Sequence, residues 1–264
     1  MFVRIEQPSD SRLAPFRDVG SPAALEAAGL FVAEGRIVVQ RLIDDAEFPV
    51  VGILVTEAAR AGLSGTLDSV SAPVYVCERR IVDAITGFNF HRGCLALAER
   101  RPSTASLDAF AGASRLLALE GVGNPDNIGG LFRTALALAA DGLVLDAASG
   151  DPFYRKAIRT SMAATLRVPF VRTSDVQAAI ATLRSKGFRV VALTPSADAQ
   201  SIDDLASTRR HRLVLLLGSE GGGLTTGTMA LADIRARIPV DARADSLNVV
   251  VAAAIALHVL RTEA

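Results

Sequence analysis

Three junctions in the second half of the sequence combine polar side chains with glycines, and such combinations can hold and orient a ligand. The first, NPDNIGGLFRTA at 124–135, has Asn127 and two glycines at the start of a helix and Arg133 off its apolar face. Each glycine in a helix costs about 1 kcal/mol relative to alanine, so two in the first turn indicate a close backbone approach. The structural alternative is a helix capped by Asn127 with one solvated arginine.

The second junction, LLLGSEGGGL at 215–224, is a glycine-rich turn that follows an apolar strand and carries one carboxylate, Glu220. Glycines let backbone N–H and C=O groups approach a ligand without interference from a side chain. No Gly-Lys-Ser/Thr follows, and the glycine spacing differs from that of the dinucleotide-binding fingerprint, so neither of these phosphate-binding loops fits. A flexible strand-to-helix loop is the structural alternative.

The third junction, IPVDARADSLNVVVAAAIAL at 238–257, leads from an Ile-Pro pair into a helix that is apolar on nearly every side. Ser246 and Asn248 lie at the start of this helix, where both side chains can cap free backbone N–H groups. Capping accounts fully for Ser246, whereas Asn248, expected inside the first turn, is less well explained by it. A helix of this composition is expected to be buried on most sides or at a subunit contact.

The elements that must position these junctions alternate between strands and helices. Continuous Val- and Leu-rich runs predict strands of a parallel sheet that is buried on both faces, at 116–122, 142–146, 189–193 and 212–218. Helical patterns fall between and after them, at 127–140, 154–164, 175–186 and 246–261. This alternation predicts an open α/β fold, in which ligands bind beyond the carboxyl ends of the strands.

The first half of the chain predicts a smaller α/β layer domain. Helices are expected at 23–28, 34–43 and 79–85, and strands at 49–55, 73–77 and 93–98. The charged, Pro/Ser/Thr-rich stretch ERRPSTAS at 99–106 separates the two halves. We therefore expect one domain over residues 1–104 and a second over residues 105–264.

The composition narrows the class of protein. The chain has 264 residues, with 28 basic and 28 acidic side chains and 50% hydrophobic residues, which excludes whole-chain disorder, collagen and coiled coil. No apolar run reaches the about 18 residues of a membrane span, and the N-terminus lacks a signal layout, so a cytoplasmic protein without membrane contact is expected. The zero net charge gives no support of its own for a nucleic-acid partner. Two cysteines and three histidines without metal-site spacing predict no metal.

Taken together, the three junctions resemble the motifs of the SpoU/TrmH family of RNA ribose 2′-O-methyltransferases, within the knotted SPOUT superfamily. The family's first motif pairs an asparagine, a glycine and an arginine, its second is Gly-x-Glu-Gly, and its third runs Ile-Pro and then Ser-Leu-Asn-Val. The matching residues are Asn127, Gly129 and Arg133, then Gly218, Glu220 and Gly221, then Ile238, Pro239, Ser246, Leu247, Asn248 and Val249. The resemblance extends to 151–170 and to 31–43, and it covers nearly the whole chain.

The sequence departs from the family pattern at three positions. Val240 stands where the family usually has methionine, Val250 where a serine is common, and Ala163 where a glycine is usual. None of these departures removes a matched polar group.

The resemblance implies a trefoil-knotted α/β domain with a parallel sheet, preceded by a small α/β substrate-binding domain that resembles a ribosomal-protein fold. It implies S-adenosylmethionine as the cofactor, a ribose 2′-OH of tRNA or rRNA as the methyl acceptor, and a homodimer with the 246–261 helix at its interface. The catalytic set that it implies is Asn127, Arg133, Glu220, Ser246 and Asn248. The cofactor-binding set that it implies is Leu217, Gly218, Gly221, Ile238, Pro239 and Leu247.

RNA contacts are expected from clusters of basic side chains. Arg155, Lys156 and Arg159 share one predicted helix, and Arg12, Arg17 and Arg92 are the candidates in the first domain. A solvated surface is the alternative for each of them. Two other functions stay open. One is a nucleotide-cofactor α/β oxidoreductase, although this sequence lacks the Gly-x-Gly-x-x-Gly motif expected of that class, and the other is a non-catalytic RNA-binding or ribosome-assembly protein on the same fold.

Overall fold

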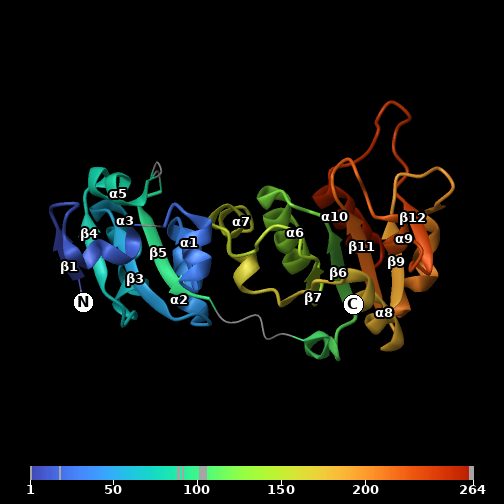
Figure 1. Ribbon diagram of the computed structural model, residues 1–264, viewed down its shortest axis with the longest axis horizontal. Helices are drawn as coiled ribbons and strands as arrows, with labels where there is room; N and C mark the ends of the chain where they lie inside the picture. The colour runs from blue at the N-terminus through green and yellow to red at the C-terminus, as the bar shows by residue number, and fades with distance from the viewer. Residues whose placement is uncertain (1, 18, 88–89, 91, 101–105, 262–264) are drawn as a thin grey trace. The chain divides into compact units, whose positions relative to one another are not determined.

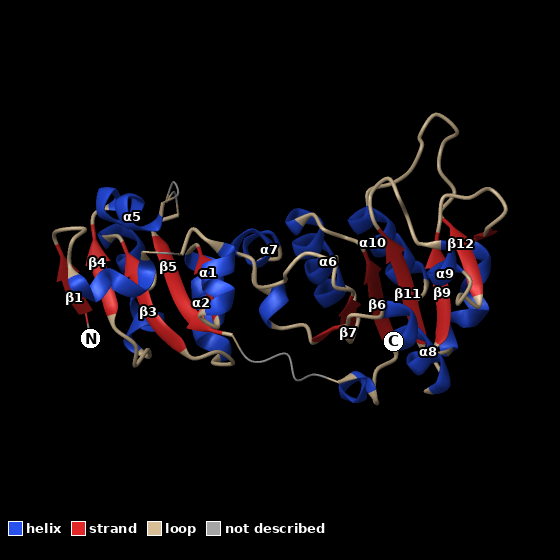
Figure 2. Cartoon of the chain, viewed as in Figure 1, coloured by secondary structure: helices blue, strands red, loops and turns tan. Residues whose placement is uncertain are grey.

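The computed structural model describes residues 2–17, 19–87, 90, 92–100 and 106–261, and the chain forms two compact units (Figure 1). The first unit comprises the described residues of 1–102 together with 153–166. The second comprises the described residues of 103–152 together with 167–264. Each unit is built on its own β-sheet (Figure 2).

The second unit contains a seven-stranded sheet in which every pair of neighbours is parallel. Its strands, in spatial order, are β10 (Gln200–Ser201), β12 (Ile234–Arg237), β9 (Arg189–Leu193), β11 (Leu213–Gly218), β6 (Arg115–Glu120), β7 (Gly142–Leu145) and β8 (Phe170–Arg172). The central strands β6, β7 and β11 are buried along almost their whole length. This confirms the parallel, doubly covered sheet that the continuous apolar runs predict.

Helices cover both faces of this sheet. Its α-helices are α6 (Pro125–Ala137), α8 (Val176–Ser185), α9 (Thr226–Met229) and α10 (Val249–Val259), and 3₁₀ turns occur at Leu107–Phe110 and Ile202–Arg210. Helix α8 packs on the face that carries Val214 and Leu216 of β11. Leu213, Leu215 and Leu217 of the same strand are buried on the opposite face, because side chains alternate along a strand. Helix α10 contacts β11 and packs along α6.

The first unit contains a mixed five-stranded sheet. Its strands, in spatial order, are β1 (Phe2–Ile5), β4 (Val74–Cys77), β3 (Val50–Val55), β5 (Cys94–Glu99) and β2 (Leu30–Glu34). Strands β1, β4 and β3 are parallel to one another, whereas β5 is antiparallel to β3 and β2. The helices are α1 (Pro22–Ala27), α2 (Arg36–Asp45), α3 (Glu57–Ala61), α4 (Ser64–Asp68) and α5 (Arg79–Thr86), with a 3₁₀ helix at Ser11–Phe16.

The segment 153–166 lies between β7 and β8 in sequence, yet it packs within the first unit. It consists of α7 (Arg155–Thr160) and a 3₁₀ turn at Ala164–Leu166, and Ile158 and Ala163 are completely buried in the core formed with α2 and the first sheet. The Phe153 ring lies 5.2 Å from that of Phe31. Our expected second domain, 105–264, contained this segment; the structure assigns it to the first unit because its apolar face completes that core. The expected boundary at residue 104 lies outside the described residues.

Ala163, the residue at a usual glycine position of the family, has a left-handed backbone with φ +69°. Met162, directly before it, has φ +54°. Glycine adopts this conformation without the steric conflict that a Cβ creates, which costs roughly 1–2 kcal/mol. The departure at position 163 therefore has a physical meaning that the sequence pattern did not reveal.

Several element boundaries differ from the expectations. Helix α2 begins at Arg36 rather than at residue 34, because Leu30–Glu34 pair with β5 as strand β2, which the sequence analysis did not predict. Strands β1, β8, β10 and β12 were also not predicted. These strands are two to four residues long and so carry little periodicity. No described helix is long and apolar enough to cross a membrane.

Candidate active site

Helix α6 brings the first junction to the carboxyl end of β6. Asn124 caps this helix by accepting a hydrogen bond from the backbone N–H of Asp126 (2.9 Å), and Pro125 occupies the first helical position. The expected cap, Asn127, instead lies inside the first turn, where it is only 6% exposed. Its side chain is therefore not needed for capping and is available for tertiary contacts.

The glycine loop, residues 218–224, doubles back on its own start after β11. A Cβ built on Gly218 would lie 2.2 Å from the carbonyl carbon of Gly223, so only glycine fits at that position. Gly221 and Gly223 have φ of +84° and +65°, the left-handed region that favours glycine. The backbone N–H of Gly223 donates to the carbonyl of Ser219 (3.0 Å), which leaves Glu220 exposed within the turn.

Helix α10 begins at Val249, three residues after the expected start of the 246–261 helix. Asn248 is the N-cap, and its Oδ1 accepts from the backbone N–H of Val250 (2.9 Å). Ser246, expected as a cap, lies exposed in the preceding loop. Because Oδ1 caps the helix, the Nδ2 group of Asn248 is available to donate to other side chains.

The three junctions meet in one hydrogen-bonded group, the amide–carboxylate cluster of Asn127, Glu220 and Asn248. Asn127 Nδ2 donates to Glu220 Oε1 (2.6 Å), and Asn248 Nδ2 donates to the same oxygen (3.2 Å). Asn248 Nδ2 also lies 3.1 Å from Asn127 Oδ1, its second acceptor. Asn127 and Asn248, which lie 93 and 28 positions from Glu220 in the chain, thus fix one oxygen of its carboxylate. Because the cluster lies at the carboxyl ends of parallel strands, it occupies the place where ligands bind in α/β sheets.

The close backbone approach expected at the first junction is present, and α10 is the partner. A Cβ built on Gly130 would lie 2.7 Å from Cγ2 of Val250. The glycine therefore lets α6 and α10 approach each other immediately beside the cluster. Val250, the residue that replaces a common serine of the family, fills this contact.

The remaining predicted catalytic residue, Arg133, lies apart from the cluster within the chain. It follows Asn127 by six residues on α6, about 9 Å along the helix axis, and its side chain is exposed. The structure thus unites three of the five predicted catalytic residues in the cluster, and Arg133 and Ser246 are not part of that hydrogen-bonded group.

The residues expected to bind the cofactor border the glycine loop and the segment between β12 and α10, which protrudes from the unit (Figure 1). Leu217 is buried, Gly218, Ile238 and Leu247 are half-buried, and Gly221 and Pro239 are exposed. A Cβ built on Gly221 would meet no atom within 4 Å, so open space lies beside the backbone of the loop.

The sequence analysis missed Asp146 and Ser149, which support the first junction. Asp146 Oδ2 accepts from the backbone N–H of Gly121 (3.0 Å), and Ser149 Oγ accepts from that of Val122 (3.2 Å). Ser149 Oγ also donates to Asp146 Oδ1 (2.6 Å). An acidic residue directly after an apolar strand was the available signal, because such positions face the loops at the carboxyl edge of the sheet.

The RNA-contact candidates on α7 are partly engaged inside the first unit. Arg155 forms an ion pair with Glu34, which is only 2% exposed, and Arg159 Nη1 lies 3.9 Å from the same carboxylate. Lys156 is half-buried. Arg155 and Arg159 therefore anchor the segment 153–166 to the end of β2, a role that their spacing did not predict.

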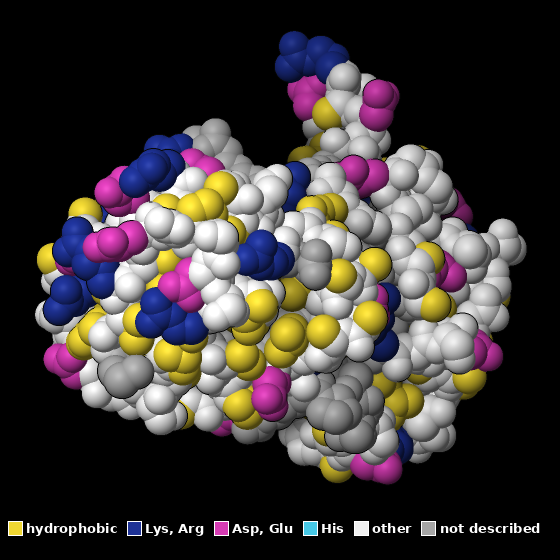
Figure 3. Space-filling model, turned by 60° about the vertical axis from the view of Figure 1, so that its left-hand side comes forward, with side chains coloured by type: hydrophobic (Ala, Val, Ile, Leu, Met, Phe, Trp, Pro, Cys, Tyr) yellow, Lys and Arg dark blue, Asp and Glu magenta, His cyan; other side chains and the backbone are white. Residues whose placement is uncertain are grey.

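The candidates nearer the N-terminus are exposed. Arg12 Nη2 pairs with Asp10 Oδ2 at 2.6 Å, and its side-chain hydrogen bond lowers the pKa of Asp10 to about 2. Arg17 Nη2 donates to the carbonyl of Pro8 (3.3 Å), and Arg92 is exposed. On the visible face in Figure 3, basic and acidic side chains are interspersed, so charge of one sign does not dominate it.

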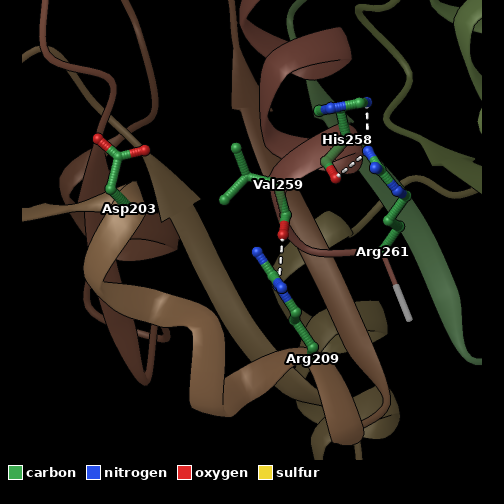
Figure 4. A pocket seen from close by; sticks show the side chains of 5 residues that line it. All are labelled: Asp203, Arg209, His258, Val259 and Arg261. Atoms are coloured by element: carbon green, nitrogen blue, oxygen red, sulfur yellow. Dashed lines mark hydrogen bonds between the residues drawn. The ribbon is translucent and has the colours of Figure 1, made fainter. Parts of the chain in front are cut away.

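A hollow of about 330 Å³ lies at the carboxyl end of α10, lined by Asp203, Arg209, His258, Val259 and Arg261 (Figure 4). It contains none of the motif residues. The cluster lies at the other end of the same helix, so this hollow is separate from the candidate site.

Two further kinds of chemistry find no support in the described part of the chain. Burial raises the pKa of the Cys77 thiol to about 11 and that of Cys94 to about 12, so neither is a thiolate nucleophile at neutral pH. Among residues 2–261 with their gaps, no three His, Cys, Asp or Glu side chains are grouped as metal ligands.

Comparison with known proteins identifies the family. Residues 114–258 match the SpoU rRNA Methylase family. An uncharacterized tRNA/rRNA methyltransferase of Mycobacterium tuberculosis is 38% identical over 256 residues, which are 95% of this chain and 88% of that protein. The 23S rRNA (guanosine(2553)-2′-O)-methyltransferase of Bacillus subtilis is 31% identical over 156 residues, 58% of this chain and 60% of that protein.

Solved structures have the same fold. An AdoMet-bound rRNA methyltransferase from Sinorhizobium meliloti superposes with a TM-score of 0.83 at 24% identity, covering 98% of this chain and 97% of that one. The SpoU methyltransferase AviRb from Streptomyces viridochromogenes, in complex with AdoMet, gives 0.80 at 21% identity over 95% and 97% of the two chains. With its three motifs joined in one cluster at the edge of a parallel sheet, the chain belongs to the SpoU rRNA methylase family.

Proposed function

We propose that this protein transfers a methyl group from S-adenosylmethionine to a ribose 2′-OH of tRNA or rRNA. The observation that carries the proposal is the amide–carboxylate cluster, in which one residue from each motif contributes to a single hydrogen-bonded group. The relative from Bacillus subtilis, whose name specifies 2′-O-methylation, and the AdoMet-bound structures of the same fold support the choice of acceptor and cofactor.

The glycine loop and the segment before α10 fit the cofactor. When bound, S-adenosylmethionine supplies a methyl group on a sulfonium, which is reactive toward an oxygen nucleophile. The exposed backbone of Gly221 has open space beside it, and its N–H and C=O groups can hold an adenosyl group without a side chain in the way. Leu217, Gly218, Ile238, Pro239 and Leu247 would form the rest of the seat.

The side chains of the chain have distinct roles in this proposal. Holding the sugar hydroxyl in line with the methyl carbon accounts for much of the rate, because orientation replaces a bimolecular encounter. The cluster gives the site a fixed anionic point, and the Arg133 guanidinium donates hydrogen bonds to a ribose or phosphate oxygen. Ser246, in the loop before α10, helps to position Arg133 and the substrate in this proposal.

RNA binding, the dimer and the knot complete the proposal. Arg12, Arg17, Arg92 and Lys156 are the basic side chains that we assign to RNA, while Arg155 and Arg159 combine that role with their contact to Glu34. Val251 on α10 is 46% exposed and Leu136 on α6 is 43% exposed, which supports a homodimer through α10. The trefoil knot rests on the family resemblance alone.

The decisive test removes the arginine of the first motif. Arg133→Ala is expected to lower methyl transfer at least about 1000-fold, because the donor to the ribose or phosphate oxygen is lost. At about 1.4 kcal/mol for each tenfold step, this is a loss of about 4 kcal/mol of transition-state stabilisation. Transfer of labelled methyl from S-adenosylmethionine to total RNA, followed by digestion to nucleosides, measures both the rate and the position of the methyl group. Cofactor affinity, measured by calorimetry, should stay within about twofold, since Arg133 is not part of the cofactor seat.

Arg235→Ala is the matched control, because Arg235 is an exposed arginine of the same unit that pairs only with the exposed Asp198 among the residues described. Normal turnover of Arg133→Ala would remove Arg133 from the mechanism. Label found on a base rather than on a ribose would refute the 2′-O assignment and leave the family membership intact.

A further inference from the structure

Glu120, a residue outside the three motifs, lies beside both ends of the glycine loop. As the last residue of β6, it pairs in register with Gly218, the last residue of β11 and the first of the loop. Its carboxylate reaches the residues that follow the loop: Thr225 N–H donates to Oε2 (2.8 Å), and Thr225 Oγ1 donates to Oε1 (2.9 Å). Thr228 Oγ1 donates to Oε1 as well (2.6 Å). One side chain thus joins the exit of the loop to its entry.

We propose that Glu120 is a positioning residue that closes the glycine loop and thereby sets Glu220 and the cofactor seat. The inference rests on the proposed function, because it assigns the loop to S-adenosylmethionine. Ser219 and Gly223 bridge the middle of the loop, Leu224 packs against the core of the unit, and the contact to Glu120 holds Thr225, the N-cap of α9. If the contact to Glu120 is lost, the turn can open and Glu220 can leave Asn127.

The contact specifically needs a carboxylate. The Thr225 N–H and the hydroxyls of Thr225 and Thr228 all donate to Glu120, and a carboxylate accepts at both oxygens. A glutamine at this position would turn an N–H group toward at least one of these donors. Thr228 is completely buried, so its hydroxyl would lose its acceptor on Glu120 and be left with Thr225 Oγ1 (3.1 Å), and the loss of a buried hydrogen-bond partner costs about 1–3 kcal/mol.

The experiment measures cofactor binding and loop opening in the full chain. The variants are Glu120→Ala, Glu120→Gln and Thr228→Val, with Thr226→Val as the matched control, because Thr226 is an exposed threonine of the same short helix. Calorimetric titration with S-adenosylmethionine, well below each melting temperature, should give about tenfold weaker binding for Glu120→Ala and Thr228→Val. Thr226→Val should remain within about twofold of the wild type.

Two further measurements separate loop closure from a general loss of stability. Amide hydrogen exchange of residues 219–225, without cofactor, should accelerate in Glu120→Ala and Thr228→Val while exchange in β3 of the first unit is unchanged. The double variant Glu120→Ala/Thr228→Val should bind S-adenosylmethionine no more weakly than the single variant with the lower affinity, because each substitution removes the same contact.

Each outcome decides one of the two claims. If the wild type does not bind S-adenosylmethionine, the proposed function fails, and the exchange measurement alone decides the role of Glu120. If the wild type binds, and Glu120→Ala, Thr228→Val and Thr226→Val agree in affinity and in exchange, Glu120 does not position the loop. Full additivity in the double variant would also overturn the inference.

Discussion

The two ends of α10 are both held by polar side chains, but in opposite ways. At the amino end, Asn248 joins Asn127 and the exposed Glu220 in the cluster. At the carboxyl end, Arg115 of β6 donates to four backbone carbonyls, those of Ser114, Arg209, His211 and Leu260. Arg115 is only 7% exposed, and burial lowers its pKa.

The difference separates a structural end of the helix from an available one. Arg115 directs its donors into the protein, where they satisfy the carbonyl of Leu260 at the end of α10 and those of Arg209 and His211 at the end of the 3₁₀ helix Ile202–Arg210. Glu220 uses Oε1 for both amides of the cluster and stays exposed, so a ligand can reach it. Polar residues at helix ends therefore indicate function only where solvent or a ligand can reach them.

The largest effect on stability is expected at the carboxyl end. Arg115→Met would remove the donor to the carbonyls of the buried Leu260, the half-buried Arg209 and the exposed His211, and we expect the free energy of unfolding to fall by about 3 kcal/mol. Chemical denaturation measures it, and Arg235→Met at an exposed site is the control. A loss no greater than that of the control would show that the helix end does not depend on Arg115.

The amino end should respond in activity instead. Glu220→Ala is expected to lower methyl transfer about 100-fold, or about 2.7 kcal/mol in activation free energy, because both amides lose their shared acceptor. The free energy of unfolding should change by about 1 kcal/mol or less, since the carboxylate is exposed. Glu220→Gln keeps an acceptor oxygen and should lie between the wild type and Glu220→Ala. Unchanged transfer together with a stability loss as large as that of Arg115→Met would reverse the comparison.

A smaller effect should arise where α6 and α10 touch. Gly130→Ala would place a Cβ 2.7 Å from Val250 Cγ2, and such overpacking typically costs about 1–3 kcal/mol. Because the displaced turn of α10 carries Asn248, methyl transfer should fall together with stability. Adding Val250→Ala makes room for the new methyl group and should restore most of both quantities, as measured by thermal melting and the transfer assay. A double variant no better than Gly130→Ala would place the strain elsewhere.

The local sequence was sufficient for the class of fold and for the positions of the motifs. The apolar runs at 116–122 and 212–218 predicted strands β6 and β11, because burial on both faces requires side chains of one kind throughout. The junction pattern drew attention to Asn127, Glu220 and Asn248 but left helix capping and a flexible loop open as alternatives, and the resemblance to the family motifs assigned them to one catalytic set. Short elements such as β8 were missed, because three residues carry no measurable period.

Tertiary structure alone decided which of these residues meet and what each one does. Asn124 rather than Asn127 caps α6, and Asn248 rather than Ser246 caps α10, because the geometry of each turn selects the side chain that can reach the free N–H. Arg155 and Arg159 face a buried Glu34 that precedes them by more than a hundred residues, and Arg115 reaches carbonyls near the end of the chain. A sequence records the type of each side chain and its neighbours along the chain, whereas contacts between distant segments depend on how whole elements pack.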